Sequence, residues 1–317
     1  MARFFKFDGD DVPDVNYIVS SLPDYVKENT EVLVDAIQFG SPTLRRITPQ
    51  TGIKTTGLVN VLAVDVPFQN GKGCCKEPAG TAELSAREIV TGMIAKIIDI
   101  CPDSLLGKWP EYLVRVPADD RKDLPFEEYL LAALISETED QMEKALWQGD
   151  TTSADPNLNK FNGFLKILAG EADVNTATIT DPTKAMATIA EVITAIPTAV
   201  LNLRPKIFVP SDFFVKLSLE LMQANLYHFE PTGDIQSIVF PGTNIEVINA
   251  PGLVGTDTIV ASPLDNMFYG TDVEDAHRRF RVIYDEKCES FRVMFRWNAG
   301  VQVAFPDRIV VADISGE

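Results

Sequence analysis

The stretch from Arg278 to Val311 decides the fold and reads RRFRVIYDEKCESFRVMFRWNAGVQVAFPDRIVV. In two of its runs every second residue is aromatic or β-branched, and most residues between them are arginine. A period of two is typical of strands, because successive side chains point to opposite faces of a sheet. The runs therefore predict antiparallel strands with one apolar and one basic face. The apolar face consists of Phe280, Val282, Tyr284, Phe291, Val293, Phe295 and Trp297.

Turn-type residues separate the runs at Asp285-Glu286-Lys287 and Asn298-Ala299-Gly300, so we expect strands to end there. From Arg278 to Arg308 there are seven basic residues, namely six arginines and one lysine, and four acidic ones, while the whole chain has a net charge of −18. A basic face on an acidic protein predicts a docking surface for another copy. The alternative is an ordinary two-sided sheet with solvated arginines. The expected contact residues are Arg279, Arg281, Arg292 and Arg296.

The composition is that of a globular protein. The chain has 317 residues, of which 45% are hydrophobic and 23% charged. The negative charge argues against sequence-independent binding of nucleic acid, although an acidic inner wall is compatible with enclosing it. We find no apolar run of transmembrane length and no secretory signal, so we expect no membrane contact and a cytoplasmic site of synthesis.

Motifs for catalysis, metals and cofactors are missing from the sequence. The chain has two histidines, no C-x-x-C pair, no Walker loop, no G-x-G-x-x-G and no G-x-S-x-G elbow. We therefore expect no cofactor, no metal site and no catalytic residues. A soluble carboxylate-dependent enzyme stays open as an alternative, because a pair of catalytic carboxylates needs no sequence motif.

Several segments differ in character along the chain. Residues 1–56 are acidic and rich in proline, which predicts an extended arm. Residues 57–98 predict two strands around a loop rich in Gly, Pro and Lys, with its tip at about 67–83. Pro125 to Gly149 is the clearest helix, with an apolar stripe and six acidic residues against one lysine.

Residues 150–274 predict helices alternating with strands. The expected helices begin at Asp181-Pro182 and at Ser211, ending at Ile196 and Ala224, and the expected strands are 206–209, 245–248 and 258–261.

The order of these parts resembles the major capsid proteins of tailed phages, with their Hong Kong 97-like fold. Four stretches carry the resemblance, and each is a loose pattern whose weight comes from its place in the order. They are ETEDQMEKALWQGD (137–150), NGFLKIL (162–168), PKIFVPSDFFVKLSLEL (205–221) and the closing segment from Thr258 to Val311.

The resemblance implies an α+β fold with five parts. These are an N-terminal arm (1–56), strands and an extended loop (57–98), a peripheral domain with a spine helix at 125–149 (99–149), an axial domain (150–274) and closing strands of the peripheral domain (275–317). The extended loop would lie over a neighbouring subunit, with the aromatic row of the closing strands under the spine helix. Unlike the family, the sequence shows no scaffold-like helical leader before the arm. Scaffolding would then come from another chain, or the sequence starts after the leader.

Within that loop, some members of the family cross-link a lysine to an asparagine of the next subunit. Lys72 and Lys76 lie in the matching loop, but no partner asparagine or assisting acid can be matched. Cys74 and Cys75 at the same tip raise the hypothesis of a disulfide between subunits, and an exposed turn with inert thiols is the alternative.

The function implied is a structural capsid protein, not an enzyme, that self-assembles into an icosahedral shell around phage double-stranded DNA. Its partners would be further copies in pentamers and hexamers, a scaffold and a portal protein, and the DNA would be enclosed without sequence-specific binding. The protein would be assembled in the host cytoplasm and reside in the virion. A nanocompartment shell protein of the encapsulin type has the same architecture and is the main alternative.

Overall fold

The computed structural model describes residues 33–69, 80–101, 126–224, 236–272, 280–288 and 290–315. They belong to two compact units. The first unit takes its described residues from Met1–Ser41, Met93–Asp140 and Asp272–Trp297. The second takes them from Pro42–Gly92, Gln141–Thr271 and Asn298–Glu317. One long helix and one long strand contribute residues to both units.

The first unit combines a sheet with helical segments. Its central strand pairs on one side with β4 and on the other, antiparallel, with β11. Arg281 lies opposite Met294, and Asp285 lies opposite Ser290, so the predicted antiparallel pairing is confirmed. The strands are β4 (Gly92–Ile100), β11 (Arg281–Asp285) and the first half of β12 (Ser290–Val303).

The long helix α4 (Phe126–Gln148) confirms the helix predicted over 125–149 to within one residue at each end. Its first turns belong to the first unit and its last turns to the second. Residues 33–39 are helical as well, with Leu33, Val34 and Ile37 buried. Their spacing of one and three residues places them on one face of that helix.

The alternation along β12 is confirmed by burial. Phe291, Val293, Phe295 and Trp297 are buried, whereas Arg292 and Arg296 are exposed. The buried rings contact each other, with Phe295 stacked on Trp297 at 4.7 Å between ring centroids. Phe280 and Phe295 contact each other edge to face, with 5.4 Å between their ring centroids.

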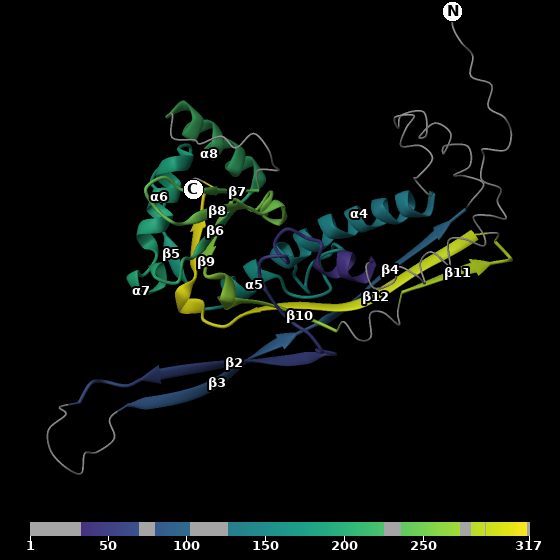
Figure 1. The fold of residues 1–317 in the computed structure, drawn as a ribbon, viewed down its shortest axis with the longest axis horizontal. Helices are drawn as coiled ribbons and strands as arrows, with labels where there is room; N and C mark the ends of the chain where they lie inside the picture. The colour runs from purple at the N-terminus through teal and green to yellow at the C-terminus, as the bar shows by residue number, and fades with distance from the viewer. Residues whose placement is uncertain are drawn as a thin grey trace, which may run out of the picture. The chain divides into compact units, whose positions relative to one another are not determined.

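The second unit contains a six-stranded sheet in the order β5-β13-β9-β6-β8-β7 (Figure 1). β6 and β8 are parallel and are joined through α8, while β9 is antiparallel to both β6 and β13. Its strands are β5 (Asn175–Ala177), β6 (Lys206–Val209), β7 (Ser237–Val239), β8 (Glu246–Asn249), β9 (Thr258–Ser262) and β13 (Val310–Asp313). Its helices are α5 (Phe164–Ala169), α6 (Ala185–Ala195), α7 (Thr198–Leu201) and α8 (Ser211–Gln223). Short 3-10 turns occur at η1 (Pro251–Leu253), η2 (Leu264–Asn266) and η3 (Pro306–Arg308).

Both faces of this sheet are covered. On one face, Ile207 and Val209 of β6 join a core with side chains of α6, α7 and α8. On the other face, the ring of Phe208 lies 5.1 Å from that of Trp147, near the end of α4. Trp147 also contacts Phe164 of α5. The strands predicted at 206–209, 245–248 and 258–261 are therefore confirmed, and so is the helix from Ser211.

β2 (Thr56–Asp65) and β3 (Thr81–Val90) form an antiparallel two-stranded sheet of their own, which confirms the predicted pair of strands (Figure 1). Near its base one face is buried in a small core with Ile53 and Ala304. The hairpin residues in that core are Val59, Val61 and Ile89. β1 (Thr48–Gln50) pairs parallel with β10 (Met267–Thr271), which also pairs antiparallel with the second half of β12.

The turn predicted at Asn298-Ala299-Gly300 is wrong. β12 continues through these residues to Val303, and Gly300 lies opposite Gly270 of β10. A Cβ atom on Gly300 would lie 2.5 Å from the carbonyl oxygen of Val90. This glycine is therefore explained by the close approach of another backbone.

Three further segments differ from expectation. The described half of the expected arm, 33–56, contains a helix and β1, because Pro42 lies beyond the end of the helix and Pro49 lies within β1, an edge strand that tolerates a residue without a backbone N–H. α6 begins at Ala185, since the Asp181 carboxylate accepts hydrogen bonds from Thr183 and forms a turn before the helix. β13 pairs with β9 and β5, so the closing segment 275–317 does not form one sheet.

Candidate assembly surfaces

The residues proposed as contacts divide into two groups. Arg281, Arg292 and Arg296 are all exposed on β11 and β12. The other five lie outside the described residues, namely Lys72, Cys74, Cys75, Lys76 and Arg279.

Arg292 is engaged within its own chain. Its Nε donates to Oδ1 of Asp99 at 2.7 Å, and its Nη2 donates to Oδ2 at 2.9 Å. The hydrogen bond from Arg292 lowers the pKa of Asp99, and the bond to Asp99 raises the pKa of Arg292. Both side chains are about half exposed, so this bidentate pair orients the guanidinium more than it stabilises the fold.

The exposed face of this sheet is less basic than predicted. Along β4, Met93 and Ile97 are exposed and lie on the same face of the strand as Asp99. On β11, Ile283 is exposed between Arg281 and Asp285. Because Asp99 bonds Arg292 across the strands, these apolar residues and the arginines occupy one mixed face. The alternation in GMIAKIIDI could have indicated this contribution of β4, which sequence reasoning missed.

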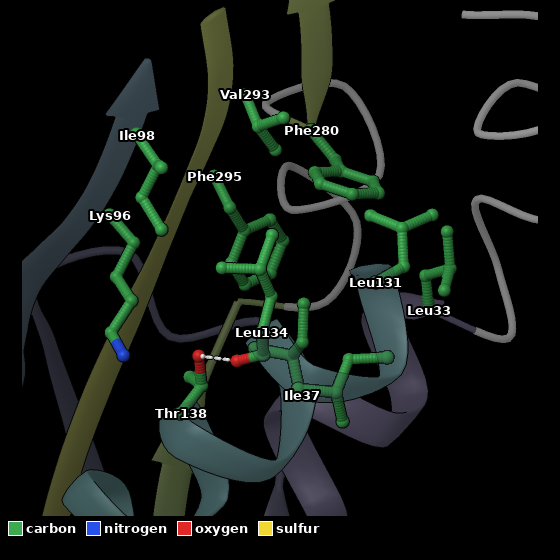
Figure 2. A pocket seen from close by; sticks show the side chains of 11 residues that line it. Leu33, Ile37, Lys96, Ile98, Leu131, Leu134, Thr138, Phe280, Val293 and Phe295 are labelled. Carbon is green, nitrogen blue, oxygen red and sulfur yellow. Dashed lines mark hydrogen bonds between the residues drawn. The ribbon is translucent and has the colours of Figure 1, made fainter. Parts of the chain in front are cut away.

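The opposite face of the same sheet lies beneath α4, and the apolar side chains there leave a small cavity (Figure 2). About 30 Å³ of it is open to a water-sized sphere. The hydroxyl of Thr138 donates to the carbonyl of Leu134 at 2.6 Å. Lys96 lines the cavity. Its partial burial lowers its pKa, although the nearby negative charge of Glu137 acts to raise it. The other lining residues are Leu33, Ile37, Ile98, Leu131, Ile135, Phe280, Val293 and Phe295.

The β2–β3 hairpin exposes an apolar face along its length. Leu62 pairs with Leu84, and the two side chains are 59% and 74% exposed. Residues an even number of positions from Leu62 along β2, or from Leu84 along β3, lie on this same face of the hairpin. They include the exposed Leu58, Val64 and Val90. An apolar face of this extent is typical of a protein interface.

Polar contacts fix the base of this hairpin. Arg87 of β3 forms an ion pair with Glu171, which follows α5. Nε2 of Gln302 donates to the carbonyl of Glu88 at 2.8 Å, and the Thr91 hydroxyl donates to the carbonyl of Thr55 at 2.9 Å. The start of the hairpin is therefore held in one orientation within the second unit.

Two carboxylates organise the rest of the second unit. The buried Glu143 accepts hydrogen bonds from the backbone N–H of Thr43 and from the indole of Trp147. Glu246 on β8 forms ion pairs with Lys206 Nζ at 2.7 Å and with Arg46 Nη1 at 2.9 Å. These contacts join loop 42–47 to α4 and to the sheet.

The described part of the chain holds no candidate metal site and no candidate membrane-spanning helix. Its His, Cys, Asp and Glu residues do not gather into a group of three or more that could hold a metal ion. Its helices include none that is both long and apolar enough to cross a membrane.

No protein-family model matches the sequence, and no curated protein matches it. Solved structures do match. A chain in the procapsid of satellite phage P4, solved with its size determination (Sid) protein, is 14% identical over 90% of each chain with a TM-score of 0.59. A chain of Gordonia phage Cozz is 14% identical over 87% of each chain with a TM-score of 0.56. A chain in the capsid of an empty GTA particle is 13% identical, covering 87% of this chain and 89% of that one, with a TM-score of 0.52. The chain has the phage capsid protein fold.

Within this phage capsid protein fold, two unlike exposed surfaces stand out. One is the apolar face of the β2–β3 hairpin in the second unit, and the other is the mixed face of β4, β12 and β11 in the first unit. At 14% identity the likeness shows the fold alone, so the role of each surface has to be argued from its own residues.

Proposed function

We propose that this chain is the structural major capsid protein of a tailed phage, with the Hong Kong 97-like form of the fold. In this proposal it self-assembles into an icosahedral shell of pentamers and hexamers that encloses double-stranded DNA. The observation that carries the proposal is the match to a procapsid chain over 90% of both chains. A match of that extent spans most of the chain and goes beyond a shared motif.

The proposed parts are those predicted from the sequence. Residues 1–56 would form an arm, 57–98 strands and the extended loop, 99–149 with the spine helix the peripheral domain, and 150–274 the axial domain. The strands β11 and β12 close the peripheral domain. β13 is assigned to the axial domain, since it pairs with β9.

Contacts between copies are proposed at the two unlike surfaces. The apolar face of the hairpin would rest on a neighbouring copy, because burial of Leu58, Leu62 and Leu84 removes exposed apolar area from water. Closed shells require contacts between two different surfaces of one subunit, which the hairpin and the mixed sheet face supply. Arg279, Arg281, Arg292 and Arg296 would meet a neighbour at the sheet. Lys72, Cys74, Cys75 and Lys76 would meet one at the tip of the loop.

The charge of the chain fits a container for DNA. A net charge of −18 prevents tight binding of the packaged polyanion, so DNA would be enclosed without sequence-specific contacts. The P4 procapsid contains a separate size determination protein. By analogy we propose a separate scaffold and a portal as partners, with assembly in the host cytoplasm and a final place in the virion.

A nanocompartment shell that holds protein cargo is the second candidate. The chain is also similar to a chain of a virus-like particle from Pyrococcus furiosus, 8% identical over 89% of this chain and 96% of that one, with a TM-score of 0.50, and we keep this second shell function for that reason. A carboxylate-dependent enzyme has no comparable support. The buried Glu143 is hydrogen-bonded to Thr43 and Trp147, as a structural carboxylate is.

The test is electron microscopy of the purified protein, followed by analysis of what the particles contain. We expect uniform shells that contain DNA protected from nuclease when they are isolated from infected cells. Shells with protein cargo and no DNA would favour the nanocompartment. A protein that stays monomeric across concentration and salt would refute both shell functions.

A further inference from the structure

Helix α8 carries a second apolar face. Its buried side chains, Phe213, Phe214, Leu217 and Leu221, face the core of the second unit. Val215, Leu219 and Met222 are 57%, 50% and 54% exposed. Their spacing of four and three residues places them on one side of the helix. We call these three residues the α8 stripe. Single exposed apolar residues are common on protein surfaces, but a continuous row on one helix is typical of a contact.

The exposed side chains of α6 are small and complement the larger side chains of the α8 stripe. Ala187, Ala190 and Thr194 are exposed and share one face, opposite the buried Ile189 and Val192. The hydroxyl of Thr194 donates to the carbonyls of Ala190 and Glu191, so it is satisfied within the helix. We call Ala187, Ala190 and Thr194 the α6 face. Small side chains let another helix approach closely and receive larger side chains between them.

Both surfaces belong to the same unit but lie over different parts of its sheet. α6 and α8 contact each other, but α6 also contacts β5 and β13 at one edge of the sheet, whereas α8 contacts β8 next to the other edge (Figure 1). Because the α8 stripe and the α6 face lie on different helices, one copy can offer one surface to each of two neighbours. Contacts of this heterologous kind close into rings. A contact between two α8 stripes would pair two copies and stop.

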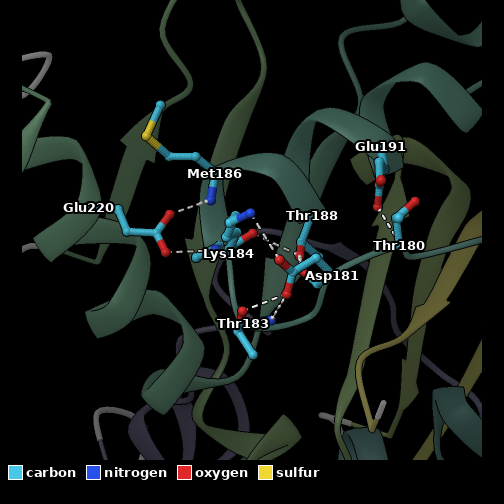
Figure 3. Close-up of polar contacts among 9 residues, drawn as sticks. Thr180, Asp181, Thr183, Lys184, Met186, Thr188, Glu191 and Glu220 are labelled. Carbon is cyan, nitrogen blue, oxygen red and sulfur yellow. Dashed lines mark hydrogen bonds and ion pairs between the residues drawn. The ribbon is translucent and has the colours of Figure 1, made fainter. Parts of the chain in front are cut away.

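Charged residues at matching positions favour the same pairing. Asp212 precedes the α8 stripe by three residues, and Lys184 precedes Ala187 of the α6 face by three. With the two helices aligned in one direction, these opposite charges meet, and Lys216 comes near Glu191. Figure 3 shows the contacts that Lys184 and Glu191 make with the segment before α6. Lys184 lies 3.1 Å from a carboxylate oxygen of Asp181, and Glu191 accepts a hydrogen bond from the Thr180 N–H at 2.9 Å.

We propose that the α8 stripe of one copy packs on the α6 face of the next copy around each ring of the shell. The proposal rests on the proposed shell function and specifies the contact between second units. It assigns Leu219 to the centre of the contact, and Asp212 with Lys184 to its alignment.

The first experiment places a charge in the stripe. Leu219→Glu leaves the monomer folded, since the side chain is exposed, and we expect it to raise the protein concentration needed for shell formation by about tenfold or more. The matched control is Val254→Glu, which puts the same charge on another exposed apolar residue of the second unit. Thermal unfolding of the monomer and sedimentation of the assembled fraction are measured for both variants.

The second experiment tests the pairing of the helices. Asp212→Lys places two lysines together and should weaken assembly, and so should Lys184→Asp, which places two acids together. The double variant restores opposite charges and should recover assembly to within about threefold of wild type. Partial loss in both single variants without recovery in the double variant would overturn the assigned alignment.

The outcomes separate this proposal from the proposed function. If wild type assembles and Leu219→Glu assembles at the same concentration, the ring contact is refuted and the shell function stands. If wild type never assembles, both are refuted.

Discussion

At the scale of single residues, Glu246 shows how charge supports the second unit. It lies on β8 directly opposite Lys206 of β6, and it also binds Arg46 from the segment before β1. One carboxylate thus links two strands of the sheet to a loop about 200 residues earlier. The side chain is 21% exposed, so water screens these ion pairs less than it screens pairs at the surface.

The acid stability of the second unit should depend on this residue. Partial burial alone would raise the pKa of Glu246, but hydrogen bonds from Lys206, Ser237 and Arg46 lower it to about 2. A folded-state pKa below the unfolded value means that the stabilisation is complete above about pH 5 and is lost as the pH falls toward 2. We expect the free energy of unfolding of Glu246→Gln to be lower than that of wild type at neutral pH and equal to it near pH 2.

Urea unfolding at a series of pH values measures that difference. Asp265→Asn removes an exposed carboxylate from the same unit and serves as the control. The assignment fails if the gap between wild type and Glu246→Gln keeps its size at low pH.

At the scale of elements, β12 depends on one glycine. Gly300 continues the strand past the predicted turn, and a Cβ there would lie 2.5 Å from the Val90 carbonyl oxygen and 3.0 Å from the Thr91 Cα. Both obstacles are backbone atoms, which cannot rotate away. Gly300→Ala should therefore destabilise the second unit by about 2 kcal/mol or more.

Gly170→Ala provides the control, because a Cβ at Gly170 would meet its nearest atom at an ordinary 3.4 Å. Thermal denaturation should show a clear loss for Gly300→Ala and little change for Gly170→Ala. Equal melting temperatures for the two variants would contradict the close approach of the strands.

The two faces of β12 predict opposite mutational effects at neighbouring positions. Phe295 is 3% exposed and contacts Phe280 and Trp297, so Phe295→Ala should cost about 3–5 kcal/mol of unfolding free energy. Arg296→Ala removes an exposed side chain and should cost less than about 0.5 kcal/mol. Chemical denaturation of both variants checks the pair, and similar losses would mean that the alternation is misassigned.

These elements also show where sequence reasoning succeeds and where it fails. The alternation in FRVMFRW and the apolar stripe of α4 predicted a strand and a helix, since burial itself imposes those periods. Asn298-Ala299-Gly300 was misassigned because a turn and a close approach of backbones both require glycine. The Arg292–Asp99 pair joins residues about 190 apart, and β13 lies about 50 residues from its partner β9 and about 135 from β5, so these contacts could not be foreseen.

At the scale of the whole molecule, the charge distribution bears on assembly. The chain has a net charge of −18, while Arg281 and Arg296 are exposed on the mixed sheet face. Arg292 is already neutralised by Asp99. Attraction between copies through this face should therefore depend more on Arg296 than on Arg292, and apolar burial must supply most of the affinity.

We expect shell formation to weaken when NaCl is raised from about 50 mM to about 500 mM, because the Debye length shortens severalfold. Arg296→Gln should reduce this salt dependence, and Arg292→Gln should reduce it less. Light scattering against salt concentration for the three proteins provides the measurement. Assembly that is equally efficient at both salt concentrations would show that these charges do not guide it.

The position of β13 has a consequence for how the protein is made. Residues 310–313 form a strand between β5 and β9, which are synthesised about 135 and about 50 residues earlier. Until then the sheet is split, with β5 separated from the strands it must join. The second unit therefore completes its fold only after residue 313 has been translated, and a chain interrupted before that point cannot present a finished α6 face to a neighbour. In the proposed shell, an unfinished chain would therefore lack the contact through the α6 face.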